Sequence, residues 1–188
     1  NTDWYKEILR PADIQNHSLN VNGGGQKATY SVGANYFGQE GILDMKNEYE
    51  RFNLRSKLDF KANEWLTIGG NMILSNATKY GEEAGAWNQA YFAVPILPIY
   101  DEMLKGVAEP INFANAQDIG YRSGQNPFPT MKFSDNRLKI RKMLANFYAK
   151  IDIIPEKLNF KTTYNLAFTS LEERNVRLPY FIGNSFQR

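Results

Sequence analysis

The sequence predicts an all-β protein, an antiparallel transmembrane β-barrel segment of about six strands. Three pairs of alternating strands are each joined by a tight turn, and the paired residues are 15–22 with 27–37, 51–61 with 66–76, and 142–154 with 158–168. Much longer loops separate one pair from the next. Short turns that alternate with long loops are typical of a transmembrane barrel, with the turns at the periplasmic rim and the loops outside the cell.

The first pair turns at Gly23, Gly24, Gly25 and Gln26. No Lys-Ser or Lys-Thr pair follows these glycines, and strands rather than a helix flank them, so a phosphate-binding loop is not indicated. We expect a hairpin turn that uses the freedom of glycine at positive φ. In residues 27–37, apolar or aromatic side chains alternate with small polar ones.

The third strand, residues 51–61, has the sharpest alternation. Its apolar side chains share one face, interrupted only by Ser56, and are Phe52, Leu54, Leu58 and Phe60. The opposite face carries four basic residues among its members, and we expect all of them to face the lumen: Arg51, Asn53, Arg55, Lys57, Asp59 and Lys61. Successive side chains of a strand point to opposite faces, so this strand has one apolar and one charged wall.

Residues 66–76, 142–154 and 158–168 repeat the alternation. Each apolar face spans about 9–11 residues, the length that a tilted strand needs to cross hydrocarbon. A soluble sheet alternates as well, because one face packs on a core. Two features favour the barrel: the density of basic residues on one wall, and aromatic residues near the strand ends, where interfacial girdles belong. Those aromatic residues are Tyr36, Phe52, Phe60, Trp65 and Phe168.

Composition excludes several classes of protein. The chain has 188 residues, a net charge of +2, no cysteine and one histidine, His17. No apolar run approaches the ~20 residues of a membrane helix, and the near-neutral charge gives no nucleic-acid footprint. No nucleophile–base pair or carboxylate pair stands out, so we expect neither an enzyme nor a cofactor. We expect no metal site, and Glu82 and Glu83 are interpreted as solvated loop charges rather than calcium ligands.

An ordered series of motifs resembles a known family. The series begins with Asn-Thr-Asp-Trp at residues 1–4 and His-Ser-Leu-Asn-Val-Asn-Gly-Gly at 17–24, and continues with Ala-Thr-Tyr at 28–30 and Tyr-Phe-Gly-Gln-Glu-Gly-Ile at 36–42. It ends with Glu-Arg-Phe-Asn-Leu-Arg at 50–55 and Pro-Ile-Leu-Pro-Ile-Tyr-Asp at 95–101. In order and content, nearly the whole chain resembles the SusC/RagA class of TonB-dependent outer-membrane transporters, in the segment that follows the plug domain.

The resemblance implies a location and partners. In that family a barrel of about 22 strands surrounds an N-terminal plug in the bacterial outer membrane. A SusD-like surface lipoprotein covers the barrel, and TonB supplies energy through a box near the N-terminus. We find neither a plug nor a TonB box in these residues and expect an excerpt of a larger barrel. The implied function is active import of oligosaccharides or peptides.

The long insert, residues 77–136, is predicted to be an extracellular loop that carries specificity. Residues 87–94 are expected to form a short helix that ends before Pro95. Aromatic rings can stack on sugars or line a peptide groove, and the rings that are candidates to contact the substrate or the lid are Trp87, Tyr91, Phe92, Tyr100, Tyr121 and Phe128. Packing of the loop against itself is the alternative for each of these rings.

Two other interpretations stay open. An eight-stranded passive outer-membrane barrel fits the length, although residues 177–183, broken by Pro179, make a poor seventh strand. A soluble all-β binding module would instead pack the apolar faces into a sandwich. The sequence does not distinguish a glycan from a peptide as the cargo.

Overall fold

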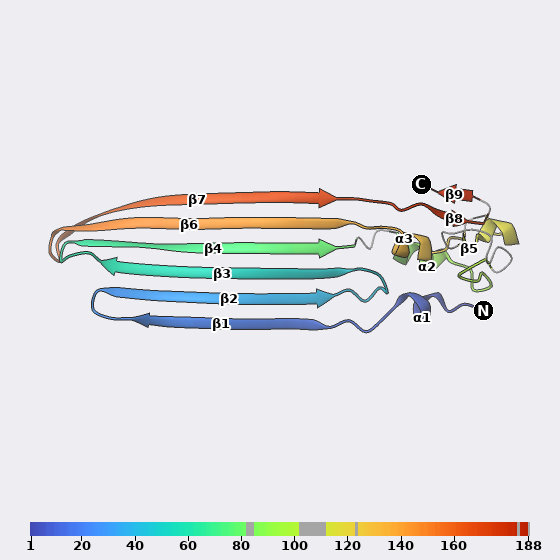
Figure 1. Cartoon of the computed structure of the whole chain (residues 1–188), viewed down its shortest axis with the longest axis horizontal. Coiled ribbons are helices and arrows are strands. Elements are labelled where there is room, and N and C mark those ends of the chain that lie inside the picture. Colours follow the sequence, from blue (N-terminus) through green and yellow to red (C-terminus); the bar gives the residue numbers. More distant parts are fainter. Residues whose placement is uncertain (82–84, 102–111, 123, 184, 188) are drawn as a thin grey trace.

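The structure is a computed structural model that describes residues 1–81, 85–101, 112–122, 124–183 and 185–187. Figure 1 shows a long sheet with a cluster of short helices, strands and loops at one end, and both chain termini lie at that end. We call this the loop-end cluster; it comprises the described parts of residues 1–13, 41–47, 81–136 and 175–187. None of the described helices has the length and apolar character needed to span a membrane.

The sheet is a six-stranded antiparallel meander in the order β1-β2-β3-β4-β6-β7. Its strands are β1 (Ile14–Gly24), β2 (Ala28–Glu40), β3 (Glu48–Lys61), β4 (Leu66–Tyr80), β6 (Arg137–Ile154) and β7 (Leu158–Arg174). The three tight turns lie together at the end away from the loop-end cluster (Figure 1). The six predicted strands and three predicted hairpins are therefore confirmed.

Every strand of the sheet extends further toward the loop-end cluster than predicted. The predicted loop 77–136 is the clearest correction: β4 continues to Tyr80 and β6 begins at Arg137, so the connection is residues 81–136. Residues 77–80 pair in register with residues 137–140. The apolar alternation used to place strand ends fades toward the loop-end cluster, whereas backbone pairing continues beyond that point.

The turn at Gly23–Gly25 is confirmed, but its glycines are needed for a different reason than predicted. None of them has a positive φ, in contrast to Gly81, Gly85, Gly120 and Gly183. A Cβ at Gly24 would instead lie 2.8 Å from the carbonyl oxygen of Ala28. The Gly25 N–H donates to that same carbonyl at 2.7 Å. Close approach of the two chains, rather than a left-handed backbone, favours glycine here.

The loop-end cluster is built from short elements. These are α1 (Trp4–Ile8), α2 (Ala86–Phe92), β5 (Asn112–Phe113), the 3-10 helix η2 (Ala116–Ile119), α3 (Phe128–Lys132), β8 (Tyr180–Ile182) and β9 (Ser185–Gln187). Helix α2 confirms the helix predicted at residues 87–94 and ends before Pro95. The weak strand expected at residues 177–183 does not join the large sheet, because β8 pairs with β5 and β9.

The hydrophobic core lies in the loop-end cluster and not on the sheet. Its buried members are Trp4, Ile8, Leu43, Met45, Ala86, Ala90, Leu97, Phe113, Ala114, Ala116, Phe128 and Met131. Phe113 is fully buried, with the rings of Tyr100 and Phe133 each 5.6 Å from it between centroids. The indole N–H of Trp4 donates to the Val94 carbonyl at 3.0 Å and thereby ties α1 to the long connection.

Candidate functional site

The two faces of the large sheet differ in chemistry along their whole width. Strand registers place Leu19, Ala34, Leu54, Leu74, Met143 and Phe168 in one row across all six strands. On the same face, the apolar rows continue toward the turns as far as Leu66, Ile151 and Phe160. From Leu66 to Leu74 the strand rises about 27 Å, or about 21 Å of height at the usual barrel tilt. With the aromatic row of His17, Tyr36 and Phe52 at the loop side, this approaches the ~25 Å apolar band of outer-membrane barrels.

No described segment of the chain covers this apolar face. Leu19 is 68% exposed, Phe147 53% and Tyr164 65%, although each stands in the middle of a regular strand. A soluble sandwich of these residues would bury such side chains against a second sheet. An uncovered apolar face of this extent needs a hydrocarbon or protein partner.

Two of the predicted aromatic residues, Tyr36 and Phe52, mark the loop-side border of the band, whereas Phe168 lies one row inside it, opposite Met143. His17, Tyr36 and Phe52 occupy neighbouring positions in one row, and the rings of His17 and Tyr36 stack with centroids 6.3 Å apart. The same row continues into Asn76 and Arg141. The border therefore changes from aromatic over β1–β3 to polar over β4 and β6.

The opposite face carries the six residues predicted to line the lumen. Arg51, Asn53, Arg55, Lys57, Asp59 and Lys61 alternate with the apolar residues of β3. The structure brings Asn53 and Lys57 beside polar residues of β2 and β4, whereas Arg51 lies beside Phe37. An amide ladder runs from Asn16 to Asn35 to Asn53, with hydrogen bonds of 2.7 and 3.4 Å. This wall offers donors and acceptors in a strip that crosses β1, β2 and β3.

A charged cluster near the turn end of the same face was not predicted. Asp59 pairs with Lys57 at 3.2 Å and accepts a hydrogen bond from the Tyr148 hydroxyl at 2.6 Å. Lys161 lies over the Tyr148 ring, with its Nζ 4.5 Å from the centroid. Tyr148 crosses β4 at Gly69, where a Cβ would lie 2.6 Å from both Asp59 Oδ1 and the tyrosine ring. A glycine flanked by an aromatic residue on the next strand was the signal in the sequence, but only the register shows the pairing.

The polar wall also contains an apolar patch toward the loop-end cluster. Ile73 on β4 lies opposite Leu144 on β6, and Ile140 lies opposite Leu171 on β7. Leu144 and Leu171 are 47% and 67% exposed. Arg55, a predicted lumen residue, shares a row with Ile73 and Leu144. This wall is therefore amphipathic along its length, a feature that alternation within a single strand does not reveal.

The aromatic candidates of the long connection separate into exposed and packed residues. Tyr91 and Phe92 are 71% and 54% exposed and form an edge-to-face pair on α2 with centroids 5.1 Å apart. Tyr121 is also exposed. Trp87 is partly buried against the core, and Phe128 is buried within it.

Tyr100 lies between these two groups. Its ring stacks on Phe113, while its hydroxyl accepts a hydrogen bond from Lys132 Nζ at 2.8 Å. The six candidates therefore do not form one surface. The exposed rings of α2 and Tyr121 lie within the described ranges 85–101 and 112–122. Glu82 and Glu83, interpreted as solvated loop charges, lie outside the described residues. Within the described residues, no group of three or more His, Cys, Asp or Glu side chains is arranged to hold a metal.

An uncovered apolar band, an aromatic border, an opposing polar wall, short turns and long loops together define a segment of an outer-membrane β-barrel. Comparison with known proteins then gives the class. No family model matches the chain. TonB-dependent receptor P3 of Formosa agariphila is 30% identical over 89% of this chain, which covers 17% of that receptor. TonB-dependent receptor SusC of Bacteroides thetaiotaomicron is 23% identical over 99% of this chain and 20% of its own length.

Solved structures share the fold. The RagAB peptide importer in its open-open state superposes with a TM-score of 0.70 at 20% identity, over 94% of this chain and 20% of that one. In the closed-closed state the TM-score is 0.68 at 19% identity. The chain belongs to the SusC/RagA class of TonB-dependent transporters and corresponds to a segment of their barrel. It spans no more than a fifth of the length of the relatives named here.

Proposed function

We propose that this chain forms part of the wall of a TonB-dependent transporter that imports oligosaccharides or peptides across the bacterial outer membrane. The proposal rests on one observation: one face of the six-stranded sheet is apolar and the opposite face is polar. The row through Leu54 is apolar on all six strands, and the adjacent row contains Asn53, Ser75 and Lys142. Lipid on one side and a polar lumen on the other satisfy both faces.

The loop-end cluster then lies outside the cell, where cargo and a surface lipoprotein of the SusD class would meet it. The exposed pair Tyr91 and Phe92 is the part of the aromatic set best placed for such contacts. Phe128, being buried, contributes packing that holds α3 against the cluster. The names of the relatives support import by receptors and importers rather than catalysis, and one of them is a peptide importer.

Uptake by the parent transporter tests the proposal. Proteoliposomes would contain the full-length protein together with its energising inner-membrane complex, and entry of labelled oligosaccharide and peptide pools would be measured. A transporter with its TonB box deleted is the matched control. We expect accumulation only with the intact box. Equal entry in both preparations would instead show a passive pore, and no entry of either pool would contradict both cargo classes.

A further inference from the structure

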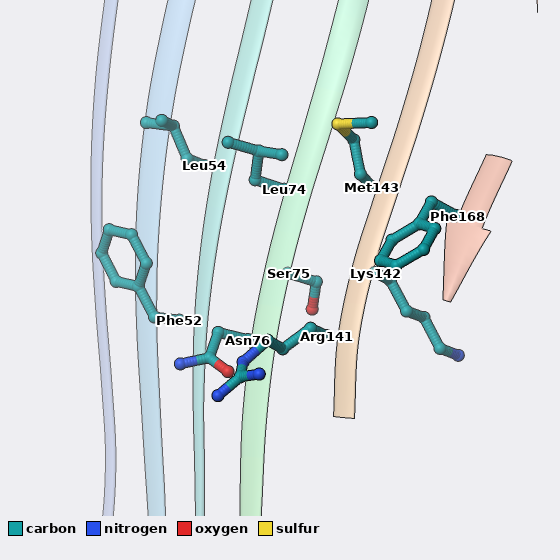
Figure 2. Close-up of a pocket in the computed structure, with 9 residues that line it drawn as sticks. All are labelled: Phe52, Leu54, Leu74, Ser75, Asn76, Arg141, Lys142, Met143 and Phe168. Atoms are coloured by element: carbon teal, nitrogen blue, oxygen red, sulfur yellow. The ribbon is translucent and has the colours of Figure 1, made fainter. Parts of the chain in front are cut away.

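The apolar face has a hollow at its loop-side border. Figure 2 shows it between β3, β4, β6 and β7, with Leu54, Leu74 and Met143 on one side and Arg141 and Asn76 on the other. Its volume is about 300 Å³, and Phe52 and Phe168 flank it. Alternation places the side chains of these residues on the lipid-side face. Ser75 and Lys142 also line the hollow, but alternation directs their side chains to the opposite face. The hollow therefore opens toward hydrocarbon at the level where the apolar band ends.

Arg141 brings a positive charge to the edge of this hollow. Its side chain is 56% exposed and points toward Asn76 in Figure 2. The nearest carboxylate oxygen, on Glu172, is 3.8 Å from its Nη2, and Glu172 is bound more closely by Arg137 at 3.1 Å. Arg141 thus keeps most of its guanidinium donors for another acceptor.

The surroundings of Arg141 on β6 and β7 are also basic. Beyond the band, Arg137, Lys139 and Arg141 follow one another on the same face of β6, and Arg174 lies opposite Arg137 on β7. On the same face, one acidic residue of β7, Glu172, lies opposite Lys139. Arg174 pairs with Asp135. The net charge at this part of the border is positive, and it adjoins an apolar hollow.

These features select a ligand with two parts. An apolar hollow that faces hydrocarbon accepts an acyl chain, and a guanidinium at the membrane border binds a phosphate in its planar fork better than it binds a neutral headgroup. Basic pockets at membrane borders bind anionic lipid headgroups in this manner. We propose that Arg141, Lys139 and Asn76, with the hollow lined by Leu54, Leu74 and Met143, form a binding site for a phosphate-bearing acylated lipid.

This inference rests on the proposed membrane placement and adds a specific lipid to it. The phosphate lies against Arg141 and Lys139, and one acyl chain occupies the hollow. Since the loops face outward, the lipid belongs to the outer leaflet. A water-soluble protein is disfavoured as the occupant, because the hollow lies below the border rather than in the exposed loops.

Lipid retention by the purified full-length parent transporter tests the site. Native mass spectrometry in detergent would measure occupancy by monophosphorylated lipid A, by the same lipid without phosphate, and by either one in the presence of inorganic phosphate. Arg141→Gln is compared with Lys142→Gln, which removes the same charge from the opposite face at the same depth. We expect Arg141→Gln to reduce retention of the phosphorylated lipid about tenfold, equivalent to about 1.4 kcal/mol, and Lys142→Gln to leave it unchanged.

A second variant tests the hollow independently of charge. Leu74→Trp fills it, so we expect weaker retention of the phosphorylated lipid with Arg141 intact. Equal loss for Arg141→Gln and Lys142→Gln, equal binding of the phosphate-free lipid, or full displacement by millimolar inorganic phosphate would each overturn the proposal. Retention of a copurified protein at Arg141 in place of lipid would do the same. The folded fraction and uptake of the wild-type protein are measured on the same preparation, so a transporter that imports but retains no lipid contradicts this inference alone.

Discussion

At the scale of single residues, Leu54 and Arg55 test which face of the sheet meets lipid. They are adjacent on β3 at nearly the same depth, and only their directions differ. We expect Leu54→Arg to impair assembly of the parent barrel more than Arg55→Leu. An arginine on the lipid face costs about 2–4 kcal/mol at mid-bilayer and about 0–1 kcal/mol near an interface. Leu54 lies in the last apolar row before the row of Tyr36 and Phe52, so the cost at this position falls between these values. Changes on the lumen side mainly tune selectivity.

The measurement is the heat-modifiable folded fraction of each variant in outer membranes. Arg55 shares its row with Ile73 and Leu144, so a leucine there has apolar neighbours and is tolerated. Comparable loss in both variants, or a greater loss in Arg55→Leu, would reverse the assignment of the faces.

Side-chain contacts on the polar wall also explain why β4 carries a glycine near its turn end. Tyr148 reaches Asp59 only because Gly69 leaves the intervening position empty. The Tyr148–Asp59 hydrogen bond thereby joins β6 to β3 across β4, in addition to the backbone ladders. Lys57 and Lys161 compensate the carboxylate and stack on the ring, so the cluster fixes side chains on a wall that would otherwise be freely solvated.

At the scale of elements, the strands were predictable and the loop-end cluster mostly was not. Alternation in β3 gave both faces correctly, because each residue's direction follows from its position in the strand. Strand ends were placed too early, since pairing of residues 77–80 with 137–140 persists where hydropathy no longer alternates. Short helix α2 was predicted from Pro95 and the residues before it. The contact of β5 with β8 joins residues far apart in the sequence, and no local pattern indicates it.

In the candidate site, too, some features follow from local sequence patterns and others depend on tertiary packing. The six β3 residues predicted to face the lumen follow from alternation, and the structure places them on one face. The aromatic candidates of the long connection do not follow from composition, because exposure depends on tertiary packing. Phe92 and Phe128 have the same side chain, yet one is 54% exposed and the other 6%. Asn126 explains part of this difference: it is buried, donates to the Ile99 carbonyl at 2.8 Å and accepts from the Phe128 N–H at 3.1 Å.

The loop-end cluster should therefore behave as a small folded unit with its own core. We expect Phe113→Ala in the parent transporter to loosen this cluster, since removing a fully buried phenylalanine costs about 3–5 kcal/mol. Phe92→Ala removes the same side chain from an exposed position and should have little effect on packing. Limited proteolysis of intact outer membranes measures the difference as the rate of cleavage within residues 81–136.

The six-stranded sheet supplies an internal reference for that experiment, because the rings that pack on Phe113 (Tyr100, Phe133 and Tyr180) all lie outside it. The heat-modifiable shift of the barrel should persist in both variants. Equal cleavage rates for Phe113→Ala and Phe92→Ala would show that the connection has no cooperative core.

At the scale of the whole molecule, the sheet is incomplete in two directions. Its apolar face lacks a cover among the described residues, and β1 and β7 each pair with a single strand of the sheet. Both deficits are met in a closed barrel, where lipid covers the outer face and neighbouring strands remove the edges. A soluble module would need other residues of the chain to cover the apolar face and the two strand edges. The described residues outside the sheet already pack in the loop-end cluster.

The behaviour of residues 1–188 alone separates these possibilities. Expressed without detergent, the isolated segment should aggregate, because side chains such as Leu19 and Tyr164 are more than 60% exposed and two strand edges are open. Sedimentation velocity and thermal unfolding measure the outcome, with the full-length parent refolded in detergent as the control that closes the barrel. A monodisperse monomer that melts cooperatively in buffer would support the soluble all-β module instead. The loop-end cluster does not rescue the segment, since its core covers Phe113 and Leu97 but leaves the band of Leu54 and Leu74 uncovered.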